Sequence, residues 1–195
     1  MQSKNIPVRK KDSEYRDRKY ISEEEFKKLY NGRIKGKRES EKRILRHKSI
    51  LSLLYYHGLR RCELCNLKWN SIDWLARTIT IRRNKRGKDS IHPLVKGEKS
   101  ILSSLYKLRR SRYIIDSPSG KATASCINGF FSNLNEQKII PIKVTPHMLR
   151  HGCGFYLANK GVDTRTIQVY LGHKSIQSTS VYTEIAPARF MNLFD

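Results

Sequence analysis

The sequence predicts a mainly α-helical fold that contains one small antiparallel β-hairpin or sheet. Apolar residues recur at helical spacing in most segments after residue 20, whereas residues 77–82 alternate polar and apolar side chains, as a half-buried strand does. A length of 195 residues fits one compact domain. No apolar run approaches the ~20 residues of a membrane span, and the N-terminus lacks the apolar core of a signal peptide. We therefore expect neither a membrane protein nor a secreted disulfide scaffold.

The first third of the chain is expected to hold a polar tail and three helices. Residues 1–20 are charged and lack periodicity, which is typical of a segment that orders only on its target. A capping box that begins at Ser22 starts a helix, and Gly32 can end it. Apolar residues at helical spacing then predict a longer helix up to Gly58, and a short helix that ends near Trp69 follows.

The change of period places a β-hairpin in the middle of the chain. Residues 77–82 form its first strand and residues 89–92 its return strand, joined by the polar and strongly basic sequence Asn-Lys-Arg-Gly-Lys. Helical spacing returns at Gly97. A turn at residues 117–120 precedes the next helix, which Thr123 can cap.

The C-terminal part of the chain is expected to be helical. Thr145 followed by Pro146 is a strong helix start, because an N-cap hydroxyl precedes proline at the first helical position. This helix is expected to end at Gly161, and Asp163 can cap a short helix after it. A final set of helical turns carries Tyr182.

The net charge indicates a polyanionic partner. Lysine and arginine number 40 against 17 aspartate and glutamate, which gives a formal charge of +23. Phosphate neutralisation and counterion release make nucleic acid the expected partner. An anionic membrane surface is disfavoured, because no long basic amphipathic stretch carries Trp or Phe opposite the charges. A basic surface that serves solubility alone is the plainer alternative.

The four cysteines predict no metal site. Cys62 and Cys65 have the spacing of a zinc-ligand pair, but Cys126 and Cys153 stand singly and no second close pair follows. The pair also lies in a segment that is typical of one or two helical turns. We therefore expect buried, reduced thiols with a structural role.

One predicted helical turn gathers three residues that can act on a phosphate or a proton. His147 and Arg150 lie three residues apart and share a helix face, and His151 follows directly. The positive end of the helix dipole disfavours a charged imidazole in the first turn, which suits His147 as a proton acceptor. A histidine and an arginine on a solvated helix surface explain this segment equally well when it is taken alone.

Two further segments carry a weaker signal. Arg60 and Arg61 follow a helix end, and Glu63 can anchor one of the two guanidinium groups. In isolation, a surface ion pair explains this segment better. His173, in the sequence Leu-Gly-His, precedes Tyr182 by nine residues.

These segments occur together and in order, and in this combination the sequence resembles the tyrosine site-specific recombinases, also called phage-type integrases. Their catalytic domain has an arginine box G-L-R-x-x-E-L, a hairpin lysine, H-x-L-R-H, L-G-H and then a tyrosine. The resemblance covers about residues 20–190, and it is strongest to the short recombinases that invert fimbrial promoter switches. The matching residues are Gly58, Leu59, Arg60, Glu63, Leu64, Lys85, His147, Arg150, His151, Leu171, Gly172, His173 and Tyr182.

The resemblance implies a tyrosine recombinase catalytic-domain fold over residues 21–195. It also implies a basic tail at residues 1–20 and no separate N-terminal core-binding domain. The implied reaction is a transesterification that needs no metal, ATP or other cofactor. Tyr182 would attack a backbone phosphodiester and give a 3′-phosphotyrosine bond and a free 5′-hydroxyl.

The resemblance assigns roles to the other motif residues. Arg60 and Arg150 would clamp the non-bridging oxygens of the five-coordinate transition state, and His173 would add a hydrogen bond. His147 would accept or orient the tyrosine proton, and Lys85 would protonate the leaving 5′-oxygen. The expected supporting residues are Glu63 and His151, and the expected DNA contacts are Arg61, Arg83, Arg86 and Lys88.

The implied partner is double-stranded DNA with inverted-repeat recombination sites. Exchange between two sites needs four protomers, so the resemblance implies a homotetramer assembled on DNA. DNA-bending accessory proteins are further candidate partners, and the location would be the cytoplasm, at the nucleoid. The implied outcome is inversion of a promoter-bearing segment that controls fimbrial phase variation.

Two other functions stay open from the sequence. Residues 163–182 can also form the helix-turn-helix of a non-catalytic DNA-binding regulator, with residues 175–182 as its recognition helix. Arg60 and His147 would then be incidental. The second alternative is a phage-type integrase or a relaxing enzyme of the topoisomerase kind, with the same chemistry at other sites.

Overall fold

The computed structural model describes residues 18–32, 40–83 and 89–184 of the chain. The helices are α2 (Glu23–Asn31), α3 (Glu41–Tyr56), α4 (Arg61–Asn66), the 3-10 helix η1 (Trp69–Ser71), α5 (Glu98–Lys107), α6 (Ala124–Glu136), α7 (Pro146–Asn159), α8 (Thr164–Leu171) and α9 (Gln177–Glu184). The strands are β1 (Ile72–Asp73), β2 (Thr78–Ile81), β3 (Ser90–Pro93), β4 (Asp116–Ser117) and β5 (Gly120–Lys121). The predictions for Lys85, Arg86 and Lys88 lie outside the described residues, as do those for most of the tail.

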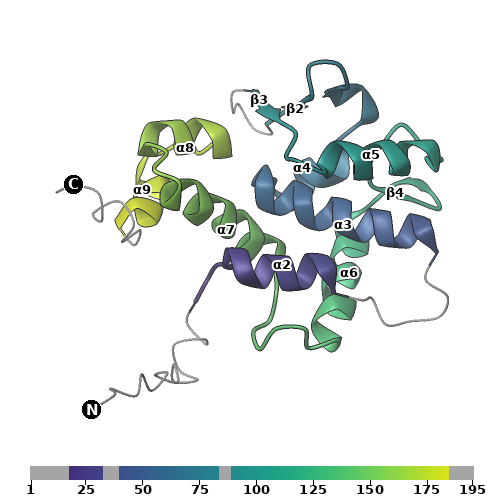
Figure 1. Cartoon of the computed structure of the whole chain (residues 1–195), viewed down its shortest axis with the longest axis horizontal. Coiled ribbons are helices and arrows are strands. Elements are labelled where there is room, and N and C mark those ends of the chain that lie inside the picture. The colour runs from purple at the N-terminus through teal and green to yellow at the C-terminus, as the bar shows by residue number, and fades with distance from the viewer. Residues whose placement is uncertain (1–17, 33–39, 84–88, 185–195) are drawn as a thin grey trace, which may run out of the picture.

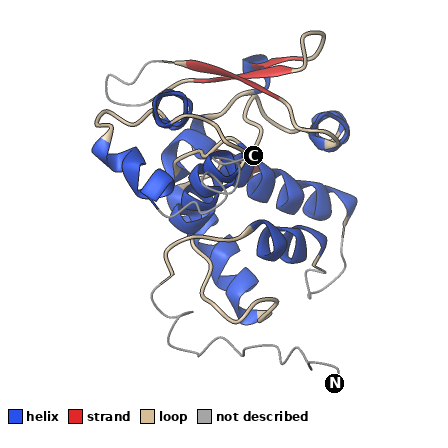
Figure 2. Ribbon diagram, turned by 60° about the vertical axis from the view of Figure 1, so that its left-hand side comes forward, coloured by secondary structure: helices blue, strands red, loops and turns tan. Residues whose placement is uncertain are grey.

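Helix α3 is the centre of the fold. It packs against α7, α5, α2 and α4, and Figure 1 shows it crossing the middle of the molecule. Figure 2 shows the three-stranded sheet lying along one side of the helices. Ile50, Leu51, Leu53 and Leu54 of α3 are fully buried, and they join the main core. The predicted class, mainly α with a small antiparallel sheet, is confirmed.

The predicted helix starts are confirmed by their caps. Side-chain oxygens of Ser22, Thr123, Thr145 and Asp163 each accept a hydrogen bond from the backbone N–H three residues further on. These bonds satisfy donors that the first helical turn leaves free. Helix α8 ends at Gly172, whose positive φ of 66° closes the last turn.

The sheets contain more strands than the sequence predicted. The three-stranded sheet has the order β1-β2-β3 and is antiparallel, with Ile79 opposite His92. Strand β1 has only two residues, and so short a segment carries no alternating pattern that the sequence could reveal. The predicted turn at residues 117–120 joins the small antiparallel pair β4 and β5.

A second, smaller core joins the last three helices. Cys153 and Phe155 of α7, Ile167 and Leu171 of α8, and Tyr182 of α9 are buried together. The Tyr182 ring meets the Phe155 ring edge-on, with 5.1 Å between centroids. Tyr182, the predicted nucleophile, is therefore also part of this hydrophobic core.

The expectation of buried cysteines is wrong for two of the four. Cys62 and Cys126 are exposed, whereas Cys65 and Cys153 are buried, and all four are free thiols. Within the described ranges, no group of three or more His, Cys, Asp or Glu side chains could hold a metal ion. Over the same ranges, no helix combines the length and the apolar character of a membrane span.

Replacing Gly152 with alanine is expected to destabilise the fold. A Cβ at this position in α7 would lie 2.5 Å from the Ile21 carbonyl oxygen and 2.7 Å from Tyr55 Cε2. We expect the free energy of unfolding to fall by about 1–3 kcal/mol, as overpacking does. Urea denaturation measures this change. The matched control is Gly129→Ala in α6, where a Cβ meets nothing within 4 Å; its better helix propensity should raise stability by up to about 1 kcal/mol.

Candidate active site

Arg60 is held in place at the start of α4. It is the N-cap residue of that helix, and its backbone N–H donates to Glu63 Oε2 over 2.8 Å. Its guanidinium donates to Glu63 Oε1 over 3.0 Å and to the Gly172 carbonyl over 3.2 Å. About a third of the side chain (35%) stays exposed. Glu63 thus fixes both ends of a residue whose charge still reaches solvent.

Arg150 is a buried arginine in α7 that ties three segments together. Its guanidinium donates to the Gly58 carbonyl, and to the Leu171 carbonyl over 2.7 Å. Burial, together with the neighbouring charges of Arg60 and Arg83, lowers its pKa to about 10. Arg150 therefore keeps its positive charge at neutral pH, although the guanidinium groups of Arg60 and Arg83 lie nearby.

Arg83 corrects one of the predicted DNA contacts. Its side chain, at the end of β2, is completely buried: Nη1 donates to Glu63 Oε2 over 2.8 Å, and Nη2 donates to the Tyr170 carbonyl. A charged side chain leaves water only when it is paired in this way. Arg83 therefore acts inside the protein, where it holds the hairpin to Glu63.

The cluster of Arg60, Arg83 and Arg150 carries an excess of positive charge. Glu63 lies within 4.0 Å of all three guanidinium groups and is the one carboxylate that the described residues pair with them. Three positive charges against one negative charge leave a net charge of +2. This arrangement can bind an anion and stabilise negative charge that develops on it.

The cluster opens into a pocket of about 330 Å³ between α4 and α7. Arg60, Arg150 and His147 line it, so the structure brings together three of the predicted site residues. Arg61 lies at the same pocket, exposed, and donates to Asn128 Oδ1 of α6 over 2.7 Å.

The Tyr182 hydroxyl is held by His151. Nδ1 of His151 lies 2.9 Å from the hydroxyl oxygen, and only 1% of Tyr182 is exposed. Burial raises the pKa of Tyr182 to about 12, and burial together with the charges of His147 and Arg150 lowers the pKa of His151. A neutral histidine thus faces a protonated tyrosine. The family resemblance assigns this position to His147, whose ring centroid lies 6.2 Å from that of His151.

His173 also lies near Tyr182. The two ring centroids are 6.2 Å apart, and His173 Nδ1 lies 2.9 Å from the Thr179 hydroxyl of α9. Burial, with the charges of Arg150 and Arg60, lowers the pKa of His173 to about 3. A neutral His173 can still donate one hydrogen bond. Thr179 could not be recognised from the sequence, because a threonine six residues after a histidine matches no motif with a chemical meaning.

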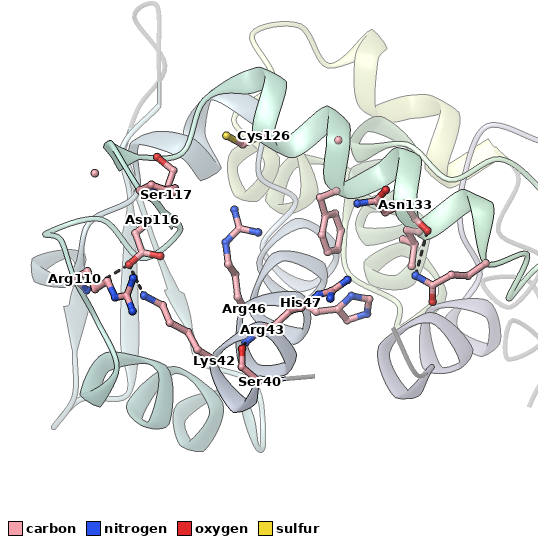
Figure 3. Close-up of a pocket in the computed structure, with 16 residues that line it drawn as sticks. Ser40, Lys42, Arg43, Arg46, His47, Arg110, Asp116, Ser117, Cys126 and Asn133 are labelled. Atoms are coloured by element: carbon pink, nitrogen blue, oxygen red, sulfur yellow. Dashed lines mark hydrogen bonds and ion pairs between the residues drawn. The ribbon is translucent and has the colours of Figure 1, made fainter. Parts of the chain in front are cut away.

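A larger cavity, of about 950 Å³, lies elsewhere in the molecule, between α3, α6 and the β4–β5 turn (Figure 3). Figure 3 shows the Arg46 side chain pointing into it. At its rim, Lys42 Nζ forms an ion pair of 2.8 Å with Asp116. None of its lining residues belongs to the pocket of Arg60 and Arg150, so the two are separate features.

The structure thus brings a buried tyrosine hydroxyl and two histidines together with an arginine cluster that can bind an anion. The comparisons with known proteins identify the class of protein. The chain matches the Phage integrase family over residues 19–189. The chain therefore belongs to the phage integrase family, the tyrosine recombinases.

Two of the relatives regulate fimbriae in Escherichia coli. The type 1 fimbriae regulatory protein FimB of strain K12 is 36% identical over 157 residues, which cover 77% of this chain and 78% of FimB. FimE of the same strain is 35% identical over 158 residues, which cover 75% of this chain and 78% of FimE. The tyrosine recombinase XerA of Pyrococcus furiosus is 34% identical over 86% of this chain and 57% of its own length.

Solved structures share the fold. A crystal structure of XerA recombinase superposes with a TM-score of 0.73 at 31% identity and covers 88% of this chain. The match spans 62% of that XerA chain. The Tn1549 transposon integrase, in complex with circular intermediate DNA, gives a TM-score of 0.70 at 21% identity, over 84% of this chain and 61% of that one. The predicted tyrosine recombinase catalytic-domain fold is confirmed.

Proposed function

We propose that the protein cuts and rejoins DNA at specific sites through a 3′-phosphotyrosine intermediate. The observation that carries this proposal is the Tyr182 hydroxyl, hydrogen-bonded to neutral His151 beside an arginine cluster with a net charge of +2. In cleavage, the bond from Tyr182 Oη to phosphorus forms and the bond from phosphorus to the 5′-oxygen breaks. One phosphoester replaces another, so the proposed reaction needs no metal, ATP or other cofactor.

The proposed roles follow the contacts of each side chain. Arg60 and Arg150 bind the non-bridging oxygens, and His173 donates a further hydrogen bond. His151 Nδ1 accepts the tyrosine proton, since it already lies 2.9 Å from the hydroxyl. His147, which lines the pocket with the two arginines, contacts the phosphate. Lys85 protonates the leaving 5′-oxygen, a role that rests on the family resemblance alone.

We propose inversion of a promoter-bearing segment for fimbrial phase variation as the biological outcome. The similarity to FimB and FimE, which are named regulators of type 1 fimbriae, supports it. The substrate is double-stranded DNA with inverted repeats, bound by a homotetramer with DNA-bending accessory proteins at the nucleoid in the cytoplasm. Residues 1–20, Arg61, Arg86 and Lys88 are the proposed DNA contacts.

The structure argues against the recognition-helix alternative. Tyr182 and Thr179 of α9 are buried, at 1% and 0% exposure, and α9 packs against α7 and α8. In that alternative Tyr182 itself contacts the DNA, which its burial prevents. A phage-type integrase that acts on other sites stays as the second proposal, because the integrase structures share the fold.

Covalent capture of DNA tests the proposal. The protein is expressed in a bacterial host, the cells are lysed in hot detergent, and the DNA that stays attached to the protein is sequenced. We expect adducts that map to inverted repeats, and inversion of a plasmid segment flanked by those repeats. Adducts at scattered sites, or deletion between direct repeats without inversion, would favour the integrase or relaxing enzyme. Tight binding without any adduct, also on nicked suicide duplexes, would overturn catalysis.

A further inference from the structure

Three buried polar side chains and the half-buried Ser90 form a hydrogen-bonded chain that the proposed reaction does not use. His57 Nε2 lies 2.9 Å from Glu98 Oε2, and His57 Nδ1 lies 3.3 Å from His92 Nδ1. At the far end, His92 Nε2 lies 2.8 Å from the Ser90 hydroxyl. Both histidines are 0% exposed and Glu98 is 3% exposed. Burying this many polar groups is costly unless each has a partner, so the arrangement calls for a physical reason.

The proton positions in this chain are restricted. Burial lowers the pKa of His92 to about 2, so its ring is neutral and carries one N–H. His57 Nε2 donates to the Glu98 carboxylate, and the two Nδ1 atoms and the Ser90 hydroxyl complete the chain. A single proton then lies between the two Nδ1 atoms. A leucine at either histidine would break the chain.

The chain joins the β-hairpin to the loop that carries Arg60. His57 caps the C-terminus of α3, three residues before Arg60. His92 belongs to β3, and its ring stacks on the Tyr170 ring of α8 with 3.7 Å between centroids. Glu98 is the first residue of α5. The contact between the histidines therefore fixes β3 relative to the arginine site.

The other strand of the hairpin is fixed to the same site. Arg83, at the end of β2, binds Glu63 and the Tyr170 carbonyl, and its backbone N–H donates to Asp89 Oδ1 over 3.1 Å. The segment between the strands, residues 84–88, contains Lys85. Both strands that lead into this segment are thus held against the arginine cluster by buried contacts.

We propose that His92 and His57 are positioning residues for strand cleavage: their contact holds β3 in register with the Arg60 loop. This inference rests on the proposed role of Lys85 as the general acid. Neither histidine touches the DNA. Replacing either one should therefore impair protonation of the leaving 5′-oxygen and leave phosphate binding intact.

A pair of suicide duplexes built on the mapped cleavage site tests the inference. One has the ordinary 5′-oxygen at the scissile phosphate, and the other has a bridging 5′-sulfur. When the phosphorus–sulfur bond breaks, sulfur leaves as a stable thiolate and needs no proton. We expect His92→Leu to slow cleavage of the oxygen duplex by about 100-fold or more, and to cleave the sulfur duplex at close to the wild-type rate.

Three further variants complete the experiment. His92→Asn keeps a donor near the Nδ1 position and should recover part of the loss. His57→Gln keeps a donor to Glu98 but removes the ring nitrogen that contacts His92 Nδ1, so it should show the His92→Leu pattern if that variant fails to fold. Ile91→Ala, on the exposed side of the same strand, should cleave both duplexes normally.

The outcomes separate this inference from the role of Lys85. If Lys85→Ala is slow on both duplexes, the proposed general acid is wrong. If Lys85→Ala recovers on sulfur but the folded histidine variants are slow on both duplexes, the histidines support the fold or the arginines, and the inference is overturned. Wild-type rates for His92→Leu on the oxygen duplex would overturn it as well.

Discussion

Replacing Tyr182 with phenylalanine is expected to abolish covalent DNA capture while the protein stays folded and binds DNA. Loss of the proposed nucleophile removes the covalent route, so we expect the cleavage rate to fall by at least about 10⁴-fold. The ring keeps its contact with Phe155, and only the hydrogen bond to His151 is lost. That loss should lower the free energy of unfolding by about 1 kcal/mol.

Cleavage of a suicide duplex and urea denaturation, on the same preparation, measure the two effects. The matched control is Tyr55→Phe, a tyrosine equally buried in the main core, with its ring stacked on Phe26 at 4.0 Å. It should keep the adduct. An adduct that persists in Tyr182→Phe would move the nucleophile to another residue and refute the assignment.

Replacing Glu63 with glutamine is expected to cause the largest loss of stability at the site. Its carboxylate pairs with Arg83, whose side chain is 0% exposed, and also lies 4.0 Å from Arg150. Breaking a buried ion pair from one side leaves a buried charge without a partner, which costs about 3–5 kcal/mol. Urea denaturation should show this loss. Cleavage at low temperature, where the variant stays folded, should also slow, because Arg60 loses one of the two oxygens that orient it.

Two comparisons make the Glu63 result specific. Glu23→Gln breaks an exposed pair with Lys27 on α2 and should leave the free energy of unfolding close to the wild-type value. Adding Arg83→Met to Glu63→Gln removes the unpaired charge, so stability should recover in part while cleavage stays slow. A Glu63→Gln protein as stable as the wild type would show that Arg83 does not need the carboxylate.

The features that the sequence predicted well are local ones. The caps at Ser22, Thr123, Thr145 and Asp163 depend on a side chain and an N–H three residues away, so a short window of sequence contains the whole interaction. The family motifs are local in the same sense, because each fits within a few residues of the chain. Strand β1 was not predicted, because its two residues form a strand through their pairing with β2 and not through a pattern of their own.

The features that escaped prediction depend on residues far apart in the chain. Arg83 lies in a strongly basic segment, which is typical of a DNA contact. Its burial depends on the partner Glu63, 20 residues earlier in the chain. The contact of His57 with His92 spans 35 residues. The hydrogen bond from His151 to Tyr182 spans 31 residues and needs α9 to pack on α7. No spacing rule within one segment could reveal these pairs.

The position of Arg150 has a consequence for how a recombinase of this kind can lose its activity in evolution. Its guanidinium binds the Gly58 and Leu171 carbonyls, and thereby fastens the end of α3 and the end of α8 to α7. Selection for a soluble, folded chain thus preserves this arginine even where selection for recombination has ceased. A descendant that had become a mere DNA-binding protein would lose Tyr182 readily and retain Arg150. An intact arginine alone is therefore a poor sign of an active enzyme.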